Sequence, residues 1–220
     1  MNCLKDERPV IIIGAGGHAK VLASTLLLLG EKVLGFTDSN LAMFGAGFRG
    51  LPVLGDDSVI FGRAPDTIRL VNGIGCISVP NPREQIFQQF KDRGYEFKSV
   101  IHPRAVVCEN VIFGEGVQVM MGALIQTGCH IEENVIVNTG AIIDHDTRIQ
   151  PHCHIAPGAV LCGNCLVGRR SLVGVGATVL QSIQLGESSL IAAGAVVTRN
   201  TAPNSRVFGI PGREKARTTT

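Results

Sequence analysis

The sequence predicts an α/β, Rossmann-like domain followed by an all-β domain, a left-handed parallel β-helix made of hexapeptide repeats. Three observations predict this fold. A continuous apolar run at residues 10–13 is followed by a glycine-rich turn and a helical segment. An aliphatic residue or phenylalanine then recurs at every sixth position from Ile101 to Val197. Small and turn-forming residues lie between these positions, as in Thr139-Gly140 and Pro157-Gly158.

The period of six predicts the second domain. It matches neither the spacing of about 3.6 residues in an amphipathic helix nor the alternation of a strand. In a parallel β-helix each hexad forms one flat side and three hexads complete a triangular coil, so residues about 18 positions apart stack. Such a prism has no core until several coils stack, which explains the long run. The predicted buried positions are Ile101, Val107, Phe113, Val119, Ile125, Ile131, Val137, Ile143, Ile149, Ile155, Leu161, Val167, Val173, Val179, Leu185, Ile191 and Val197.

Composition limits the possible functions. The 220 residues are enough for two modest domains, expected at residues 1–99 and 100–200, with a C-terminal tail at 201–220. The net charge of +2 comes without a basic block or interleaved aromatic and basic residues, so nucleic-acid binding is not expected. Charged residues make up only 17% and the mean hydropathy is +0.27, which indicates much buried surface and a subunit interface.

The chain carries no predicted export or membrane segment. Residues 1–9 are charged and lack the apolar centre of a signal peptide. The longest strongly apolar stretch, 21–29, is far shorter than the roughly 20 residues that span a bilayer. The 7 cysteines are scattered and odd in number, which argues against a disulfide framework. We therefore expect a cytoplasmic protein.

The first hundred residues open with a β-α-β pattern. A buried strand at 10–13 precedes a glycine turn, a helix from about 18 to 29 and a second strand at 32–36. Such a turn lets backbone N–H groups approach a phosphate, and an acidic residue about 20 positions on can bond a ribose or base. A purely structural turn and a solvated acid are the alternatives. The predicted substrate-binding residues here are Gly14, Gly16, Gly17, His18 and Asp38.

The rest of this domain is short. After a loop through 56–57 we expect a strand near 68–71, a turn that adds Gly73 to the substrate-binding residues, a helix near 82–93 and a strand at 96–100. This amounts to about half of a full dinucleotide fold. One nucleotide with its pyrophosphate therefore fits better than NAD(P).

Several motifs resemble those of one enzyme family. The chain is similar, from Val10 to about Arg213, to the sugar acyltransferases of the bacillosamine, perosamine and sialic-acid acetyltransferase family, the NeuD/PglD type. The resemblance implies a homotrimer with active sites between adjacent prisms, acetyl-CoA as donor and a nucleotide-linked amino sugar as the usual acceptor. The motifs are Gly14-Ala15-Gly16-Gly17-His18, Asn138-Thr139-Gly140, Asp144-His145-Asp146, His154-Ile155-Ala156-Pro157-Gly158-Ala159, Gly163-Asn164 and Gly209-Ile210-Pro211.

His145 is the candidate general base. Transfer of an acetyl group from a thioester to an amine needs a group that removes a proton, and neutral histidine suits that task near pH 7. In the second half of the chain, only His145 has a carboxylate on each side, Asp144 and Asp146. It follows the buried Ile143 by two positions and should lie at an outward corner. The resemblance implies His145 as base, with Asp146 orienting it; a merely structural corner histidine is the alternative.

Three further residues are candidates near the reacting atoms. Gly163 lies 18 positions after His145, so its backbone N–H should lie one coil above and could stabilise an oxyanion, a role that the resemblance also implies. His154 resembles the family histidine that contacts the acyl donor, and Asn138 resembles a residue near the acceptor amine. The alternatives are a solvated or interface histidine and a structural amide.

The resemblance also implies a path for the coenzyme. Gly174 and Gly194 match positions where small residues let the pantetheine arm lie against the backbone. Arg213 and Lys215 follow the Gly209 turn and could meet CoA phosphates, although a basic C-terminal segment is commonly just solvated.

A metal site is not expected. Cys162 and Cys165 have zinc-like spacing and lie near a His-Cys-His segment at 152–154, but the hexad register separates them onto different faces, and no second pair with this spacing exists. A cysteine nucleophile is also disfavoured, because direct attack by the sugar amine needs only His145.

The predicted function is acetyl-CoA-dependent N-acetylation of the 4-amino group of a nucleotide-linked amino-deoxy sugar, by direct attack on the thioester. The nucleotide can be UDP, GDP or dTDP. The alternatives are a sugar O-acetyltransferase of the sialic-acid type and a non-catalytic trimer that binds nucleotide sugars.

Overall fold

The computed structural model describes residues 6–45, 47–75, 79 and 82–214. The chain divides into two compact units, Met1–Gly75 with Gln85–Val100, and Cys76–Glu84 with Ile101–Thr220. The division passes through helix α3 (Pro82–Lys91), so that its first turn groups with the second unit.

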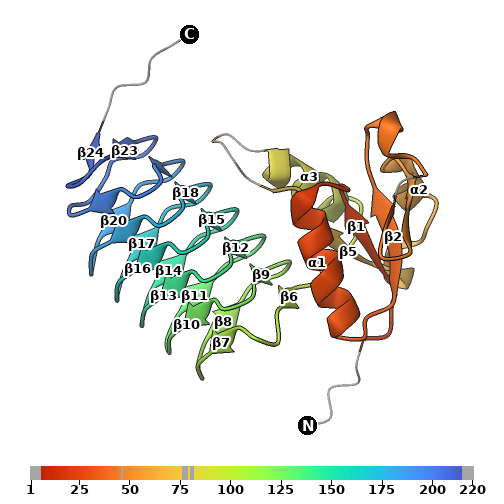
Figure 1. Cartoon of the computed structure of the whole chain (residues 1–220), viewed down its shortest axis with the longest axis horizontal. Helices are drawn as coiled ribbons and strands as arrows, with labels where there is room; N and C mark the ends of the chain where they lie inside the picture. Colours follow the sequence, from red (N-terminus) through yellow and green to blue (C-terminus); the bar gives the residue numbers. More distant parts are fainter. Residues whose placement is uncertain (1–5, 46, 76–78, 80–81, 215–220) are drawn as a thin grey trace. The chain divides into compact units, whose positions relative to one another are not determined.

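The first unit is built on a five-stranded sheet with the order β3-β4-β2-β1-β5 (Figure 1). Helix α1 follows β1 and precedes β2, and these two strands are parallel, as the sequence predicts. The hairpin of β3 and β4 was not predicted. The elements are β1 Val10–Ile13, α1 Gly17–Leu28, β2 Val33–Thr37, a 3₁₀ turn Leu41–Met43, β3 Gly47–Phe48, β4 Leu51–Gly55, α2 Ser58–Phe61, a 3₁₀ turn Pro65–Thr67 and β5 Arg69–Asn72.

Strand β1 is covered on both faces, which explains its unbroken apolar run. Ile11 and Ile13 belong to a cluster with Phe87 and Phe90. All four residues of β1 are buried. The prediction of a strand at 96–100 was wrong. Only an isolated bridge from Leu70 to Phe97 forms there, and the chain then enters β6 (Val100–Ile101), the first strand of the prism.

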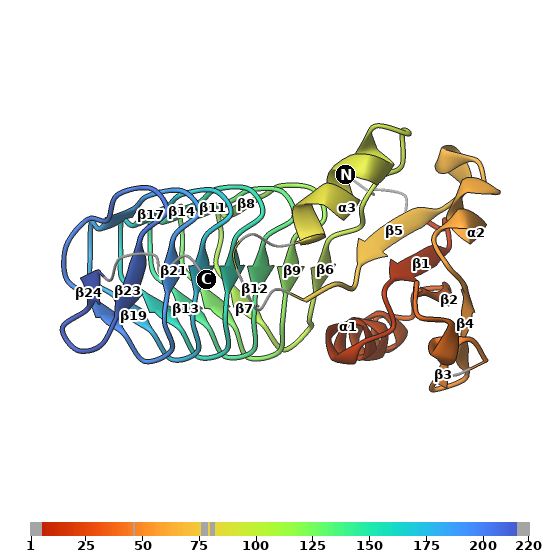
Figure 2. The ribbon, with the colours of Figure 1, turned by 90° about the horizontal axis from the view of Figure 1, so that it is seen from above.

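The second unit is a left-handed parallel β-helix, as predicted. Two-residue strands recur every six residues in three parallel sheets, and each strand pairs with the one 18 positions away, as Ile143 does with Leu161 (Figure 2). The strands are β6 Val100–Ile101, β7 Val106–Val107, β8 Ile112–Phe113, β9 Gln118–Val119, β10 Leu124–Ile125, β11 His130–Ile131, β12 Ile136–Val137, β13 Ile142–Ile143, β14 Arg148–Ile149, β15 His154–Ile155, β16 Val160–Leu161, β17 Leu166–Val167, β18 Leu172–Val173, β19 Thr178–Val179, β20 Gln184–Leu185, β21 Leu190–Ile191 and β22 Val196–Val197.

Each hexad has a second interior position that the sequence analysis missed. It lies two residues before the buried aliphatic residue and in several hexads holds a smaller, fully buried side chain, such as Ala141 or Ala159. Thiols take the same slot: the Sγ atoms of Cys129 and Cys153 each lie 3.1 Å from a carbonyl oxygen 15 residues further on. These cysteines therefore fill the core, which explains their scatter along the sequence.

The corners share one backbone conformation. Every sixth residue from Asn110 to Gly194 has a positive φ, and eight of these fifteen corner residues are not glycine, as at Asp146 (58°) and His152 (63°). The left-handed conformation alone therefore does not require glycine at a corner of this prism.

The chain continues past the last predicted hexad. Strand β23 (Arg206–Phe208) pairs in parallel with β21, as Leu190 does with Arg206, which is two residues short of the 18-residue register, and β24 (Arg213–Glu214) pairs antiparallel with β23. Part of the expected tail thus extends one sheet of the prism, while Lys215 lies outside the described residues. None of the helices in the described ranges is long and apolar enough to cross a membrane.

Candidate active site

His145 and Asp146 form a hydrogen-bonded pair at the corner after β13. His145 Nδ1 lies 2.8 Å from Asp146 Oδ2, and the side chains are 55% and 64% exposed. Because a carboxylate only accepts hydrogen bonds, Nδ1 must carry the proton, and in the neutral ring Nε2 is left with its lone pair. The neighbouring Asp144 accepts the backbone N–H of His145 at 2.8 Å. The pair therefore presents a base to the outside of the prism.

The electrostatics of this corner make His145 more basic. The hydrogen bond to Asp146 raises the pKa of His145, and the negative charge of Asp144 raises it further. The neutral ring is thus a stronger proton acceptor than an ordinary histidine.

Gly163 lies directly against the imidazole of His145. A Cβ atom at Gly163 would fall 2.5 Å from His145 Nε2 and 2.7 Å from Cε1. Among the residues that the structure describes, the Gly163 N–H has no hydrogen-bond acceptor, whereas the next amide, of Asn164, bonds to the His145 carbonyl at 2.8 Å. A backbone N–H without an intramolecular acceptor can donate to a tetrahedral oxyanion, and a neighbouring base can take the proton of the attacking group.

Asn138 and His154 form a second pair. Asn138 Nδ2 lies 3.0 Å from His154 Nε2, while Asn138 Oδ1 accepts the Thr139 N–H at 2.8 Å. The second bond fixes the orientation of the amide, so Nδ2 donates to Nε2 and the proton of a neutral His154 ring is on Nδ1. The structure thus brings together two residues that the sequence analysis had placed near different substrates.

One corner of the prism carries a column of glycines, 18 positions apart. A Cβ atom at Gly140, Gly158, Gly176 or Gly194 would meet nothing within 4 Å. Since other corners carry larger residues at the same φ, neither conformation nor packing within this chain explains the column. Gly174 is different, because its Cβ would fall 2.7 Å from the Ala193 nitrogen of the next coil. Close packing between coils therefore accounts for Gly174.

In the first unit, the glycine turn leaves the start of α1 open. The N-cap of α1 is Gly16, with no side-chain cap and no acidic residue in the first turn. Gly16 and Gly17 are exposed, and a Cβ atom on either would meet nothing within 4 Å. His18 lies in the same first turn and is partly exposed. The helix N-terminus can therefore accept a phosphate group.

The remaining predicted residues of this unit differ in role. Asp38 lies at the glycine turn, where its Oδ2 accepts the Ala15 N–H at 2.9 Å. Gly14 (φ +85°) and Gly73 are packed against neighbours: their Cβ atoms would fall 2.6 Å from Ile74 Cδ1 and from the Ile13 oxygen. The Gly73 N–H also bonds to Ile13 O at 2.8 Å. The positive φ and the contact with Ile74 both favour glycine at position 14, whereas packing alone accounts for Gly73.

Cys162 and Cys165, which have zinc-like spacing, lie in different environments of the prism. Cys165 is buried in the small interior slot, whereas Cys162 is partly exposed at a corner. Among the described residues, no three histidine, cysteine or acidic side chains lie close enough together to hold a metal ion.

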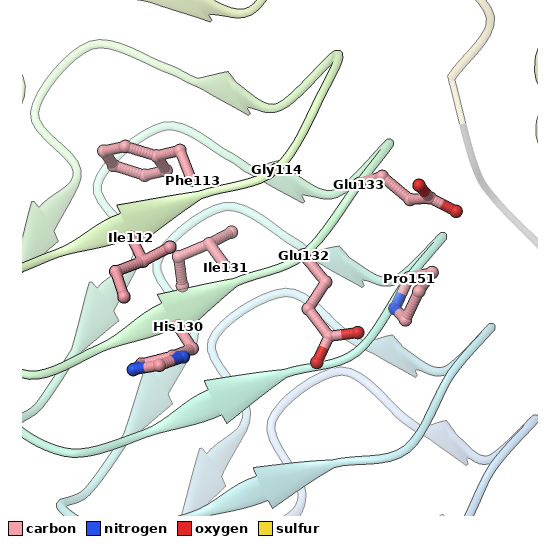
Figure 3. A pocket seen from close by; sticks show the side chains of 8 residues that line it. All are labelled: Ile112, Phe113, Gly114, His130, Ile131, Glu132, Glu133 and Pro151. Carbon is pink, nitrogen blue, oxygen red and sulfur yellow. The ribbon is translucent and has the colours of Figure 1, made fainter.

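Two hollows lie elsewhere on the second unit. One of about 400 Å³ lies on the outside of β8 and β11 (Figure 3), and its Glu132 is bonded by Arg148 at 2.6 Å. The other, of about 600 Å³, lies near the C-terminal end and is lined by Arg199 and Arg213, among others. Neither includes His145, which projects from an open corner of the single prism.

A buried histidine that the sequence analysis did not single out lies at a third corner. His152 Nδ1 lies 3.0 Å from Asn134 Nδ2, and its Nε2 lies 3.8 Å from Glu84 Oε1. Burial lowers the pKa of His152 to about 4, although Glu84 opposes this shift. Arg170 binds Glu84 with two hydrogen bonds, of 2.6 and 2.9 Å. This cluster holds residues 82–84 onto the prism.

An α/β unit with an open helix N-terminus, joined to a left-handed β-helix with a histidine–carboxylate pair at a corner, defines the class of hexapeptide-repeat acyltransferases. Two family models match the chain. The PglD N-terminal domain matches residues 9–90, and the bacterial transferase hexapeptide (six repeats) matches residues 128–163. No curated protein sequence matches.

Solved structures are similar over nearly the whole chain. The acetyltransferase domain of PglB from Neisseria gonorrhoeae FA1090 is 32% identical, with a TM-score of 0.88, over 94% of this chain and 100% of that one. PerB from Caulobacter crescentus is 36% identical, with a TM-score of 0.86, over 94% and 97% of the two chains. The chain therefore belongs to the NeuD/PglD-type family of sugar acyltransferases.

Proposed function

We propose that the protein transfers the acetyl group of acetyl-CoA to the 4-amino group of a nucleotide-linked amino-deoxy sugar. The observation that carries this proposal is the His145–Asp146 pair beside the Gly163 N–H, which has no acceptor within the described part of the chain. The comparisons support the substrate classes: PerB was solved with CoA and GDP-perosamine, and the PglB domain with acetyl coenzyme A.

The proposed reaction is direct attack of the amine on the thioester carbonyl. As the N–C bond forms, His145 Nε2 takes a proton from the amine, and Asp146 stabilises the imidazolium through its bond to Nδ1. The carbonyl oxygen becomes an oxyanion and accepts the Gly163 N–H. The C–S bond then breaks, and the CoA thiolate takes the proton from His145, which restores the neutral base.

Asn138 and His154 complete the proposed site. The bond from Asn138 to His154 Nε2 orients the imidazole ring, and the family resemblance places this ring at the acyl donor. The contact of Asn138 with the acceptor amine stays a prediction from the family resemblance.

The proposed nucleotide site is the glycine turn of the first unit. The open start of α1 would bind the diphosphate, with Gly16, Gly17 and His18 nearest to it. Asp38 would bond the ribose or base, and its contact with the Ala15 N–H holds it at the turn.

A homotrimer with active sites between subunits is part of the proposal. The outward residues of one sheet form an aliphatic row in which Val106 and Ile142 are 58% and 40% exposed. The glycine column that includes Gly194 offers an open backbone to the pantetheine arm, and Arg199 and Arg213 line a hollow that could receive CoA phosphates. The free thiols of the described residues suit a cytoplasmic location.

The test is turnover of the His145→Ala variant. Purified protein would be given acetyl-CoA with UDP-, GDP- or dTDP-linked 4-amino sugars, and CoA release and the acetylated product would be measured. Loss of a general base should lower kcat by about 10² to 10⁴-fold, with acetyl-CoA affinity and oligomeric state unchanged. His130→Ala, a change to an exposed histidine of β11, is the matched control and should keep normal turnover.

Three other results would contradict the proposal. A near-normal kcat in His145→Ala would show that His145 is not the general base. Transfer to a sugar hydroxyl, with no transfer to an amine, would favour the O-acetyltransferase alternative. Failure to bind acetyl-CoA in a calorimeter would favour a non-catalytic nucleotide-sugar-binding trimer.

A further inference from the structure

The carboxylate of Asp146 occupies the space where a side chain of Gly128 would lie. Gly128 is the equivalent corner residue one coil below. A Cβ atom there would fall 2.5 Å from Asp146 Oδ1 and 3.5 Å from its Cγ. Real Cβ atoms do not approach an oxygen that closely, so any side chain at Gly128 requires the carboxylate to move.

Backbone conformation does not explain this glycine. Gly128 has a φ of +74°, but other residues stacked at the same corner have similar values without being glycine: Asn110 (59°), Asn164 (58°) and Ser182 (59°). The residues stacked with Gly128 at this corner thus carry side chains, and Gly128 lies directly below Asp146, whose carboxylate bonds to His145.

The two oxygens of Asp146 have different surroundings. Oδ2 accepts the hydrogen bond of His145 Nδ1 at 2.8 Å, while Oδ1 lies over Gly128. Because both oxygens belong to one rigid carboxylate, a group that displaces Oδ1 also shifts Oδ2 and so disturbs its hydrogen bond with the imidazole. The bond to Asp146 is the largest contribution to the raised pKa of His145.

We propose that Gly128 is a positioning residue for acetyl transfer: its missing side chain forms the slot that holds the Asp146 carboxylate in line with His145. Gly128 touches neither substrate and acts through Asp146. This inference rests on the proposed function, in which His145 is the base. Gly163 forms a matching slot above the imidazole. The His145–Asp146 pair is thus held between Gly128 on the coil below and Gly163 on the coil above.

The Gly128→Ala variant tests the slot. We expect kcat to fall roughly 10 to 100-fold, because a displacement of about 1 Å at a catalytic pair has effects of this size. KM for both substrates should stay near normal. The acid limb of the pH–rate profile should move to lower pH, because His145 loses the bond that raises its pKa.

A double-mutant cycle separates positioning from general damage. If Gly128 acts through the carboxylate, Gly128→Ala should cause no further loss of kcat in an Asp146→Ala background. Asn110→Ala is the matched control: it places alanine at a similar positive φ in the same column and should keep normal turnover. Circular dichroism and sedimentation would check the fold of each variant.

Several outcomes overturn the inference. These are normal turnover in Gly128→Ala, an equal fold-loss in both backgrounds, an equal loss in Asn110→Ala, or misfolding of Gly128→Ala with and without Asp146. Misfolding only when the Asp146 carboxylate is present would support the clash. Normal turnover in His145→Ala would instead contradict the proposed function itself. Failure of the role of Gly128 can therefore be distinguished from failure of the proposed function.

Discussion

The imidazole of His145 lies against the backbone of Gly163, one coil higher, so closely that a methyl group on Gly163 would fall 2.5 Å from Nε2. A side chain at residue 163 would therefore require the ring to move away from the proposed position of the base beside the Gly163 N–H. Gln181, one coil above, has a large side chain at the equivalent position, so the prism itself does not require glycine there.

Replacement of Gly163 by alanine should therefore damage catalysis. In Gly163→Ala the methyl group displaces the ring from the amide that would bind the oxyanion, and we expect kcat to fall by about 10²-fold or more. Steady-state kinetics would measure this, with Gln181→Ala as the matched control in the same column. Wild-type kcat in Gly163→Ala would contradict the role of this contact.

The raised pKa of His145 predicts the position of the acid limb. The proposed base would act when His145 is neutral, so kcat/KM should rise with pH through a pKa above the ordinary value of about 6.5. The charge of Asp144 contributes to this shift, so Asp144→Asn should move the limb to lower pH and keep the plateau rate. Rates measured from pH 5 to 9 would test this, with Glu132→Gln at another corner as control.

Protonation of His152 should destabilise the protein in mild acid. Its pKa is lowered by burial to about 4, below the unfolded value of 6.5, so its contribution to stability is complete above pH 6.5 and is lost as the pH falls toward 4. The full loss is about 3 kcal/mol, from 1.36 kcal/mol per pKa unit.

The His152→Asn variant tests this dependence, because asparagine tolerates the φ of 63° at this corner. Urea unfolding at pH 7 and pH 5 should show a smaller decrease in the free energy of unfolding for the variant than for the wild type. Glu84, whose pKa is lowered by Arg170 against the effect of burial, responds only below its ordinary value of 4.5. An equal decrease in both proteins would contradict the prediction.

Two glycines predicted for the same path should respond differently to alanine. Gly174→Ala places a Cβ atom 2.7 Å from the backbone of the next coil, so the free energy of unfolding should fall by about 1 to 3 kcal/mol. A Cβ atom at Gly194 meets nothing within 4 Å, so only the φ of +68° should lower the stability of Gly194→Ala, by about 1 to 2 kcal/mol, while KM for acetyl-CoA rises. Thermal unfolding and kinetics of both variants would measure this, and an unchanged KM in Gly194→Ala would argue against donor binding at this corner.

Much of the fold follows from local patterns in the sequence. The period of six predicts the prism, because each coil repeats the same environment, and the apolar run with its glycine turn predicts β1 and α1. The strand expected at 96–100 failed, because Phe97 makes only a bridge to Leu70 before the prism begins. The β3–β4 hairpin was missed because only its position beside β2 makes that short segment a sheet edge.

The candidate site divides in the same way. Sequence neighbours and the hexad register already indicated that His145 has a carboxylate partner and lies one coil below Gly163. They did not indicate that Asn138 bonds His154, or that Gly174 is required by packing. Those contacts depend on the direction of side chains around a corner, which a period does not specify.

The sequence by itself determined the two-part architecture, the corner position of His145 and its acidic neighbours, because a repeat converts spacing along the chain into stacking in space. Only the tertiary structure decided which Asp146 oxygen bonds the imidazole, why residues 128 and 163 are glycine, and how His152 is buried beside Glu84. The physical reason is steric: these features depend on contacts of a few ångströms between different coils, or between the prism and residues 82–84.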